Sequence, residues 1–158
     1  MPDRITFESL APEREAEALA LVRTVFDAMV APGFSEQGRV SFNDYLARFA
    51  FSRREGEGFA LAAMRDGVPV GVIEVVGGNH VALFFVSEGY RGRGVGSGLM
   101  RLAVERCGRG EPRPVALTVN ASPGSVKAYA RLGFAADSGE RERDGIRFVP
   151  MTLPLQPL

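Results

Sequence analysis

One stretch constrains the fold of this chain more than any other, the glycine-rich segment Arg91-Gly92-Arg93-Gly94-Val95-Gly96. It follows an apolar run, Val81 to Val86, and it opens a segment, Val95 to Cys107, whose apolar residues recur at helical spacing. The pattern therefore predicts a strand, a tight turn and a helix in that order. This order brings free backbone N–H groups and the positive end of a helix together, and the two form a site for an anion.

Glycine suits such a turn because an anion can approach the backbone where no Cβ stands in the way, and because glycine readily adopts positive φ. Arg91 and Arg93 add positive charge. A helix start alone favours an anion by roughly 0.3–1 kcal/mol, and by up to about 2 kcal/mol when partly buried, so several amides and the arginines must act together. A diphosphate fits that arrangement better than a single phosphate does.

Two common phosphate-binding motifs do not match the turn. A nucleotide P-loop requires G-x-x-x-x-G-K-[ST], and no lysine follows these glycines. The dinucleotide motif G-x-G-x-x-G requires glycine at its sixth position, but the sequence has Ser97 there when counted from Gly92 and Leu99 when counted from Gly94. The diphosphate ligand must belong to another class.

The turn does match the motif [RQ]-x-x-G-x-[GA], as Arg91-x-x-Gly94-x-Gly96. Two further stretches extend the match. Val81 to Tyr90 is similar to the strand that precedes this motif, and Ser122 to Phe134 is similar to a later segment N-x-x-A-x-x-x-Y-x-x-x-G-F. On these residues the chain resembles the GNAT superfamily of acyl-CoA-dependent N-acyltransferases.

The later segment departs from the family pattern at its first position. Ser122 stands where the family often has Asn, and Asn120 lies two residues earlier. The residues themselves favour another interpretation, in which Ser122 is a helix N-cap and Pro123 occupies the first helical position.

Length and composition predict one domain over residues 1–158, long enough to bury a sizeable core. The chain has no apolar run as long as a membrane span, and its start does not resemble a signal peptide, so we expect a cytoplasmic protein with no membrane partner. Basic and acidic residues balance at 19 each, whereas nucleic-acid-binding proteins usually carry a basic excess. Nucleic acid is therefore not an expected partner.

Cys107 and His80 are the only cysteine and histidine of the chain, and no cluster of carboxylates has ligand spacing. The sequence therefore predicts neither an intrachain disulfide nor a metal site. Cys107 falls on the apolar face of the helix after the turn, so we interpret it as a small core residue rather than a nucleophile.

Hydrophobic periodicity and turn signals predict the order β-α-α-β-β-β-α-β-α-β-β, an α/β (α+β) fold whose mixed sheet carries helices on both faces. The resemblance implies the same order and a β-sheet that splays at its centre. The expected segments are a strand Ile5–Ser9, a helix from Pro12 ended by Pro32-Gly33, a helix from about Glu36 to Phe51, strands Phe59–Arg65, Val68–Val76 and Val81–Val86, a helix Val95–Cys107, a strand Val115–Val119, a helix Pro123–Leu132, and strands Phe134–Arg143 and Ile146–Leu153 joined at Asp144-Gly145. The first two helices are expected to bury Leu19, Val22, Phe26 and Met29, and Val40, Tyr45, Leu46 and Phe49.

The resemblance also implies where acetyl-CoA binds. Its pantetheine arm would pair with the backbone of the strand before the turn, like an added strand, and its diphosphate would contact the amides of the turn. From the residues alone, that strand is equally well a core strand. The implied cofactor-binding residues are Phe84, Phe85, Val86, Arg91, Gly92, Arg93, Gly94, Val95, Gly96, Ser97, Asn120, Ser125 and Tyr129.

Direct transfer of an acyl group requires an uncharged amine, and it requires a proton for the departing CoA thiolate. The resemblance implies that the backbone N–H of Val86 polarises the thioester carbonyl. It also implies that Tyr129 is the acid, because a phenol can give a proton to a thiolate. The alternative is that Tyr129 only packs against the sheet.

The candidate base is Glu74, which interrupts the apolar run Val72 to Val76 and therefore requires an explanation if it is buried. At a sheet edge, Glu74 would simply face water. A two-residue turn at Gly77-Gly78 would pair Glu74 near Val81, about 10 Å along the strand from Phe84, so that a water chain would be needed. His80 is a second candidate base, and deprotonation of the amine by solvent is a third possibility.

The acceptor pocket is expected between the two N-terminal helices and the final hairpin, where acidic and aromatic residues suit a cationic or aromatic amine, or simply helix packing. These residues are Phe34, Glu36, Phe42, Asp44 and Tyr45. The predicted function is an N-acetyltransferase that moves an acetyl group from acetyl-CoA to an amine of a small molecule or protein, and as a small enzyme it is expected to form a homodimer. The alternatives are a non-catalytic acyl-CoA sensor and, opposed by the neutral charge, a nucleic-acid module using Arg91 and Arg93.

Overall fold

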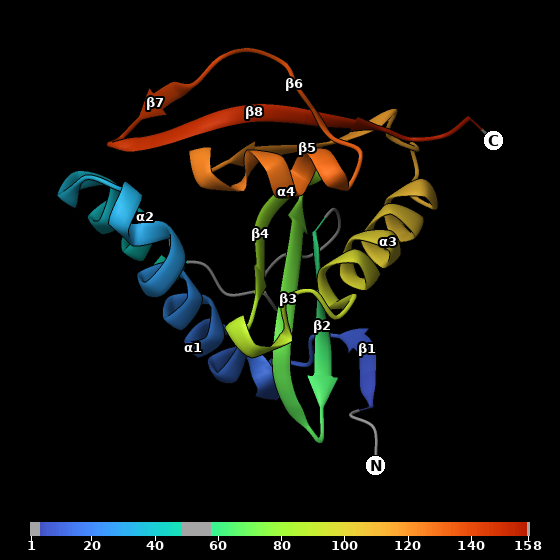
Figure 1. Ribbon diagram of the computed structural model, residues 1–158. Helices are drawn as coiled ribbons and strands as arrows, with labels where there is room; N and C mark the ends of the chain where they lie inside the picture. Colours follow the sequence, from blue (N-terminus) through green and yellow to red (C-terminus); the bar gives the residue numbers. More distant parts are fainter. Residues whose placement is uncertain (1–3, 49–57, 158) are drawn as a thin grey trace.

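The computed structural model describes residues 4–48 and 58–157, which form an eight-stranded mixed sheet in the order β1-β2-β3-β4-β5-β8-β6, with β7 paired to β8 (Figure 1). All neighbouring strands are antiparallel except β4 and β5, which are parallel. The strands are β1 (Ile5–Ser9), β2 (Phe59–Arg65), β3 (Val68–Val76), β4 (His80–Val86), β5 (Ala116–Ala121), β6 (Ala135–Ala136), β7 (Arg141–Arg143) and β8 (Ile146–Pro154).

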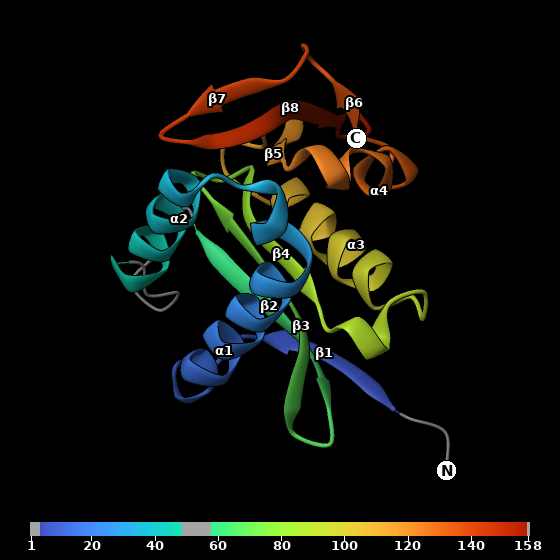
Figure 2. The same cartoon turned by 60° about the vertical axis from the view of Figure 1, so that its left-hand side comes forward.

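Helices cover both faces of this sheet, as expected. The helices α1 (Glu15–Val25) and α2 (Glu36–Arg48) lie on one face, and α3 (Val95–Gly108) and α4 (Val126–Arg131) lie on the other (Figures 1 and 2). The sheet has a hydrophobic core on each face, one under α3 and one under α1, and alternate residues of β3 point into the two cores. Ile73 packs in the α3 core and Val72 packs in the α1 core, and both are fully buried. The predicted fold class is confirmed.

The first helix is less regular than the sequence indicates. A 3-10 turn, Pro12–Arg14, precedes α1, a π-helical turn, Phe26–Val30, follows it, and a second 3-10 turn, Ala31–Gly33, ends the segment. The expectation that Met29 is buried is wrong, because a π-turn is wider than an α-turn and rotates this side chain off the buried stripe, leaving it 48% exposed.

On α2, the buried stripe runs through Gly38, Phe42 and Leu46. Val40 is two residues from both Gly38 and Phe42, and this spacing places it on the opposite side of the helix. It is 54% exposed, so its predicted burial is also wrong. The predicted end of this helix at Phe51, and the predicted burial of Phe49, lie outside the described residues.

Two hairpin turns form where Asp-Gly pairs predict them. Asp66 and Gly67 have φ of 50° and 78°, and Asp144 and Gly145 have φ of 52° and 79°. Both residues of each pair are left-handed, as a two-residue hairpin turn of the primed kind requires.

The C-terminal strands differ from the prediction in detail. The strand expected over Phe134–Arg143 is two short strands, β6 and β7, separated by a segment that contains Ser138 and Gly139, where Ser138 Oγ donates to the Gly139 carbonyl at 3.1 Å. The strand expected from Val115 begins at Ala116 instead, and Val115 is 84% exposed.

The sheet splays at its centre, as the resemblance implies. The ladder between β4 and β5 contains only His80 opposite Thr118 and Val81 opposite Val119. Beyond Val81 the two strands diverge, so the rest of β4 has no strand on that side within the described chain. This opening determines the position of the candidate site.

Candidate functional site

A cavity of about 1230 Å³ fills the opening between β4 and β5 and continues toward α1, α2 and the β7–β8 hairpin. The predicted residues that line it are Phe84, Phe85, Val86, Arg91, Asn120, Ser125 and Tyr129. Glu74, Gly92, Arg93, Gly94, Val95, Gly96 and Ser97 are not among its lining residues. The structure therefore brings the strand, the start of the turn and the later segment together at one opening.

A β-bulge in β4 determines which side chains face the cavity. Glu74 lies opposite Leu83 and Val75 lies opposite Val81, so Ala82 is an extra residue on β4. Because of this extra residue, Leu83 and Phe85 face α1 and α2, whereas Phe84 packs on the side of α4. Ala82 itself lines the cavity.

The bulge corrects the predicted position of Glu74. Val76 pairs with His80, so the turn contains three residues, Gly77 to Asn79, rather than two. The longer turn and the bulge together place Glu74 opposite Leu83, next to Phe84, rather than opposite Val81. The separation along the strand between Glu74 and Phe84 is therefore one residue rather than the three that made a water chain necessary.

Glu74 is also fully buried, at 0% exposure, because β3 lies between β2 and β4 rather than at the sheet edge. The suggestion that Glu74 faces water is therefore wrong. Its Oε1 accepts a hydrogen bond from the Tyr45 hydroxyl at 3.4 Å. Tyr45 lines the cavity and Glu74 does not, so Tyr45 links the buried carboxylate to the residues around the open space.

Tyr129 lies on α4 with its ring against two phenylalanines. The ring centroids are 5.9 Å from Phe84 and 5.4 Å from Phe134, and the side chain is 9% exposed. Burial raises the pKa of the Tyr129 phenol well above its usual range, so the hydroxyl keeps its proton at neutral pH. Tyr129 also lines the cavity at the opening between β4 and β5.

His80 lines the cavity at the last paired position of the splay. Its Nδ1 lies 2.8 Å from Thr118 Oγ1, and burial lowers its pKa, so the imidazole is neutral at neutral pH. A neutral imidazole that faces a cavity has a nitrogen that can accept a proton.

The glycine turn has the geometry that the sequence predicts. Gly92 and Gly94 have φ of 72° and 81°, and Gly94 is the N-cap of α3. A Cβ on either would meet no atom within 4 Å, so it is the backbone conformation rather than the space that requires glycine there. The next three residues, Val95, Gly96 and Ser97, have no helical partner for their N–H groups, since these are the first turn of the helix.

Tyr90 holds this turn, and the sequence interpretation missed it. Arg65 Nη1 donates to the Tyr90 hydroxyl at 2.6 Å, and the Arg93 guanidinium lies 5.2 Å from the centroid of the Tyr90 ring. Arg93 is thus stacked on Tyr90, while Arg91 lines the cavity. The only sequence signal for this contact is the position of Tyr90 directly before Arg91-Gly92-Arg93, which allows an arginine to stack on the aromatic ring.

The segment after β5 forms a 3-10 turn, Pro123–Ser125, followed by α4. Ser122 occupies the N-cap position, as predicted, but its side chain caps no backbone N–H. Instead, the Ser122 and Ser125 hydroxyls lie 2.6 Å apart, and both line the cavity. The structure therefore presents a pair of hydroxyls beside Asn120 at this edge.

The far end of the cavity is aromatic. Phe26 stacks on Phe42 with centroids 4.1 Å apart and planes 15° apart, and Phe34 meets the edge of Phe26 at 5.3 Å. Phe42 in turn lies 6.2 Å from Phe85. These four side chains all line the cavity, and we call them the phenylalanine wall. Asp44 and Tyr45 also line it, as predicted, but Glu36 does not.

At this end of the cavity, α2 lies beside the β7–β8 turn (Figure 2), and the two segments are hydrogen-bonded. Ser41 Oγ donates to the Asp144 carbonyl at 2.8 Å, and Ser35 Oγ donates to the Gly145 carbonyl at 3.0 Å. Gly38 and Gly145 approach so closely that a Cβ on Gly38 would overlap the Gly145 carbonyl oxygen. We call this contact the bridge. Sequence patterns do not reveal it, because it joins residues about a hundred positions apart.

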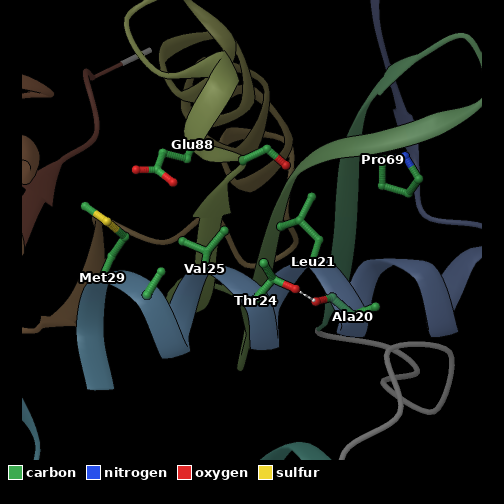
Figure 3. A pocket seen from close by; sticks show the side chains of 9 residues that line it. Ala20, Leu21, Thr24, Val25, Met29, Pro69 and Glu88 are labelled. Carbon is green, nitrogen blue, oxygen red and sulfur yellow. Dashed lines mark hydrogen bonds between the residues drawn. The ribbon is translucent and has the colours of Figure 1, made fainter. Parts of the chain in front are cut away.

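A second, smaller hollow of about 300 Å³ lies beside the π-turn (Figure 3). Leu21, Val25 and Met29 form one side, and Pro69 and Glu88 form the other (Figure 3). Val25 and Met29 line both hollows, so the π-turn separates the two spaces.

The described residues contain no group of three His, Cys, Asp or Glu side chains placed to hold a metal ion. Within residues 4–48 and 58–157, no helix is long and apolar enough to cross a membrane. Cys107 is buried in the α3 core, as predicted, and burial raises its pKa to about 11.

Comparison with known proteins agrees with this geometry. A family model described as an acetyltransferase (GNAT) domain matches residues 30–155. A GCN5-related N-acetyltransferase from Rhodopseudomonas palustris is 24% identical with a TM-score of 0.77, over 98% of this chain and 99% of that one. The apo form of YjaB from Escherichia coli is 21% identical with a TM-score of 0.71, over 94% and 97%.

PaiA N-acetyltransferase from Thermoplasma acidophilum, solved in complex with coenzyme A, is 16% identical with a TM-score of 0.73, over 96% of this chain and 99% of that one. At such identities the solved structures show a shared fold. A search of curated protein sequences finds no match.

Proposed function

Because the chain belongs to the GNAT acetyltransferase family, and is therefore an acyl-CoA-dependent N-acyltransferase, we propose that it transfers an acetyl group from acetyl-CoA directly to an amine of a small molecule or protein. The observation that carries this proposal is the splay between β4 and β5, with the glycine turn at the end of β4 and Tyr129 across the opening. The proposed enzyme acts in the cytoplasm as a homodimer.

The donor half of the proposal rests on unpaired backbone. The Ser87 N–H donates to the Val70 carbonyl on β3 at 2.8 Å. Backbone N–H groups alternate in direction along a strand, so those of Val86 and Phe84 point away from β3. They point toward the edge of β4 that is not paired with β5. The pantetheine amides of acetyl-CoA would pair there, and the diphosphate would take the free amides of Val95, Gly96 and Ser97 with Arg91 beside them.

The acyl transfer itself needs one bond made and one broken. The neutral amine attacks the thioester carbonyl carbon, and the Val86 N–H stabilises the oxygen that becomes negative. Collapse of the tetrahedral intermediate breaks the C–S bond and releases the CoA thiolate. The Tyr129 hydroxyl, which keeps its proton at neutral pH, donates to that sulfur and later regains a proton from solvent.

The amine must also lose a proton. An alkylamine with a pKa near 10.4 is only about 0.1% neutral at pH 7.4, so a base beside the acceptor adds to the rate. We propose that Glu74 takes this proton through the Tyr45 hydroxyl, which donates to the carboxylate and faces the cavity. His80 is the competing base, since its neutral ring lines the same cavity.

Calorimetry of acetyl-CoA binding, followed by a thiol-release assay over a panel of amines, tests the proposed function. We expect micromolar binding that weakens strongly when the diphosphate is missing from a CoA fragment, and thiol release that requires an amine. Tight binding without turnover of any amine would instead favour the acyl-CoA sensor. If acetyl-CoA does not bind, the proposed function is wrong.

A further inference from the structure

We propose that the acceptor is a small free amine that carries an aromatic ring, or a comparably bulky apolar group, close to its amino group. This inference rests on the proposed function, because it requires acetyl-CoA to occupy the β4–β5 end of the cavity. The ring would lie on the phenylalanine wall, in the part of the cavity bounded by the π-turn, α2 and the bridge.

The wall favours a ring because its aromatic side chains are already oriented around an open space. Phe34, Phe42 and Phe85 are only half-buried, and each has an aromatic neighbour within the wall. A ligand ring that covers them removes apolar surface from water on both partners, which favours binding by about tenfold or more. The π-turn contributes directly, since it carries Phe26, Met29 and Val30 to the same cavity.

The charges around the cavity argue against a polycationic acceptor such as a polyamine or an aminoglycoside. Only two carboxylates of the described residues line it, Asp44 and Asp144, against the three arginines Arg91, Arg143 and Arg147. Arg147 forms an ion pair with Glu140 at 2.6 Å. Arg143 lies 5.9 Å from the centroid of the Phe148 ring and has no ion pair within the described chain. A polyamine or an aminoglycoside carries several ammonium groups, and two carboxylates are too few to pair with all of them.

The bridge argues against a folded protein as the acceptor. Ser41 and Asp144 both line the cavity and are hydrogen-bonded to each other through the Asp144 carbonyl, so helix and hairpin meet at its boundary. The Gly38–Gly145 approach leaves no room for a side chain between the two backbones. A loop of a folded protein therefore cannot enter between this helix and the hairpin, whereas a free small molecule fits within the cavity.

The inference is tested with protein saturated with acetyl-CoA, in a thiol-release assay. The acceptors are 2-phenylethylamine, n-propylamine, spermidine, kanamycin and a lysine-containing peptide, compared at equal concentrations of neutral amine. We expect kcat/KM for 2-phenylethylamine to exceed that for each of the others by about tenfold or more. Equal rates with n-propylamine, or a preference for spermidine, kanamycin or the peptide, would overturn the inference while leaving the proposed function intact.

Variants then locate the ring. Phe42→Leu and Phe34→Leu are expected to raise KM for 2-phenylethylamine several-fold or more, with little change for n-propylamine and none in the affinity for acetyl-CoA. Phe59→Leu is the matched control, because Phe59 is also half-buried but stacks with Arg106 away from the cavity. If all three variants behave alike, the wall does not bind the ring and the inference is wrong. Failure of acetyl-CoA to bind in calorimetry would instead overturn the proposed function and the inference together.

Discussion

The two ends of the cavity are built in different ways. At the proposed donor end, the backbone groups come from one continuous stretch that runs from β4 through the glycine turn into α3, and Phe84, Val86 and Arg91 of this stretch line the cavity. At the acceptor end, side chains from the π-turn, α2, β4 and the final hairpin meet only because the chain folds them together. A site made of backbone is encoded locally, whereas a site made of side chains depends on long-range register. Changes at the donor end should therefore affect every substrate, and changes at the acceptor end should discriminate among amines.

The largest expected effect lies at the donor end. Gly94→Val should weaken acetyl-CoA binding on the order of 100-fold, because a β-branched residue does not adopt the φ of 81° found at Gly94, and the following amides would turn away from the proposed diphosphate site. Calorimetry measures the affinity, and thermal unfolding reports any loss of stability. The matched control is Gly89→Val, since Gly89 lies five residues earlier, without positive φ and with open space around it. Unchanged affinity in Gly94→Val would place the diphosphate elsewhere.

The next effect lies between the two ends, at the leaving sulfur. Tyr129→Phe keeps the ring contacts with Phe84 and Phe134 and removes only the hydroxyl, so kcat should fall by about 10–100-fold while the affinity for CoA stays the same. Steady-state kinetics and calorimetry measure the two quantities. A fully active variant would show that Tyr129 has a packing role only.

The pH profile gives an independent test of the same residue. Loss of the phenol proton would remove the donor, but burial raises the pKa of Tyr129, so that loss is moved above the ordinary value near 10. The rate should rise with pH as the amine becomes neutral and should not fall again up to about pH 10. A decline in kcat between pH 8 and 9 would contradict this assignment.

A smaller effect is expected at the base, on the acceptor side. Glu74→Gln should lower kcat/KM by about tenfold, and Tyr45→Phe should have the same effect, because each breaks the path from the cavity to the carboxylate. The double variant should be no slower than either single one, since both act on one path. His80→Gln is the matched control and should change the rate little. If His80→Gln instead lowers kcat/KM more than Glu74→Gln does, the imidazole rather than the carboxylate is the base.

The sequence predicted the conformation of the glycine turn and of its flanking strand and helix well, and the physical reasons are local. Glycine at positive φ, an apolar strand and a helix start are all visible in neighbouring residues, and the turn at Gly92 and Gly94 has the expected conformation. The Asp-Gly hairpins were predictable for the same reason. The role of Tyr90 was missed because its partner Arg65 lies at the end of β2, 25 residues earlier in the sequence.

The acceptor end could not be predicted to the same depth. The run Val81 to Val86 is apolar throughout, so no alternation shows that Ala82 is an extra residue, and the position of Glu74 was misjudged as a result. The π-turn leaves a helical pattern in the sequence almost unchanged while rotating Met29. The bridge depends on two glycines from distant segments, which no local pattern connects.

The smallest expected effect compares the reactivity of one thiol at each end of the cavity. Cys107 belongs to α3 and is buried in the core between this helix and the sheet, and burial raises its pKa to about 11, so only about 0.1% is thiolate at pH 8. Ellman's reagent should therefore leave native protein unlabelled and react with one thiol per chain in denaturant. In Met29→Cys, the new thiol lies at a 48% exposed position beside both hollows and should react at once, with Cys107 still protected. Prompt labelling of Cys107 in the native protein would mean that α3 opens from the sheet, and the donor end would then be no more rigid than the acceptor end.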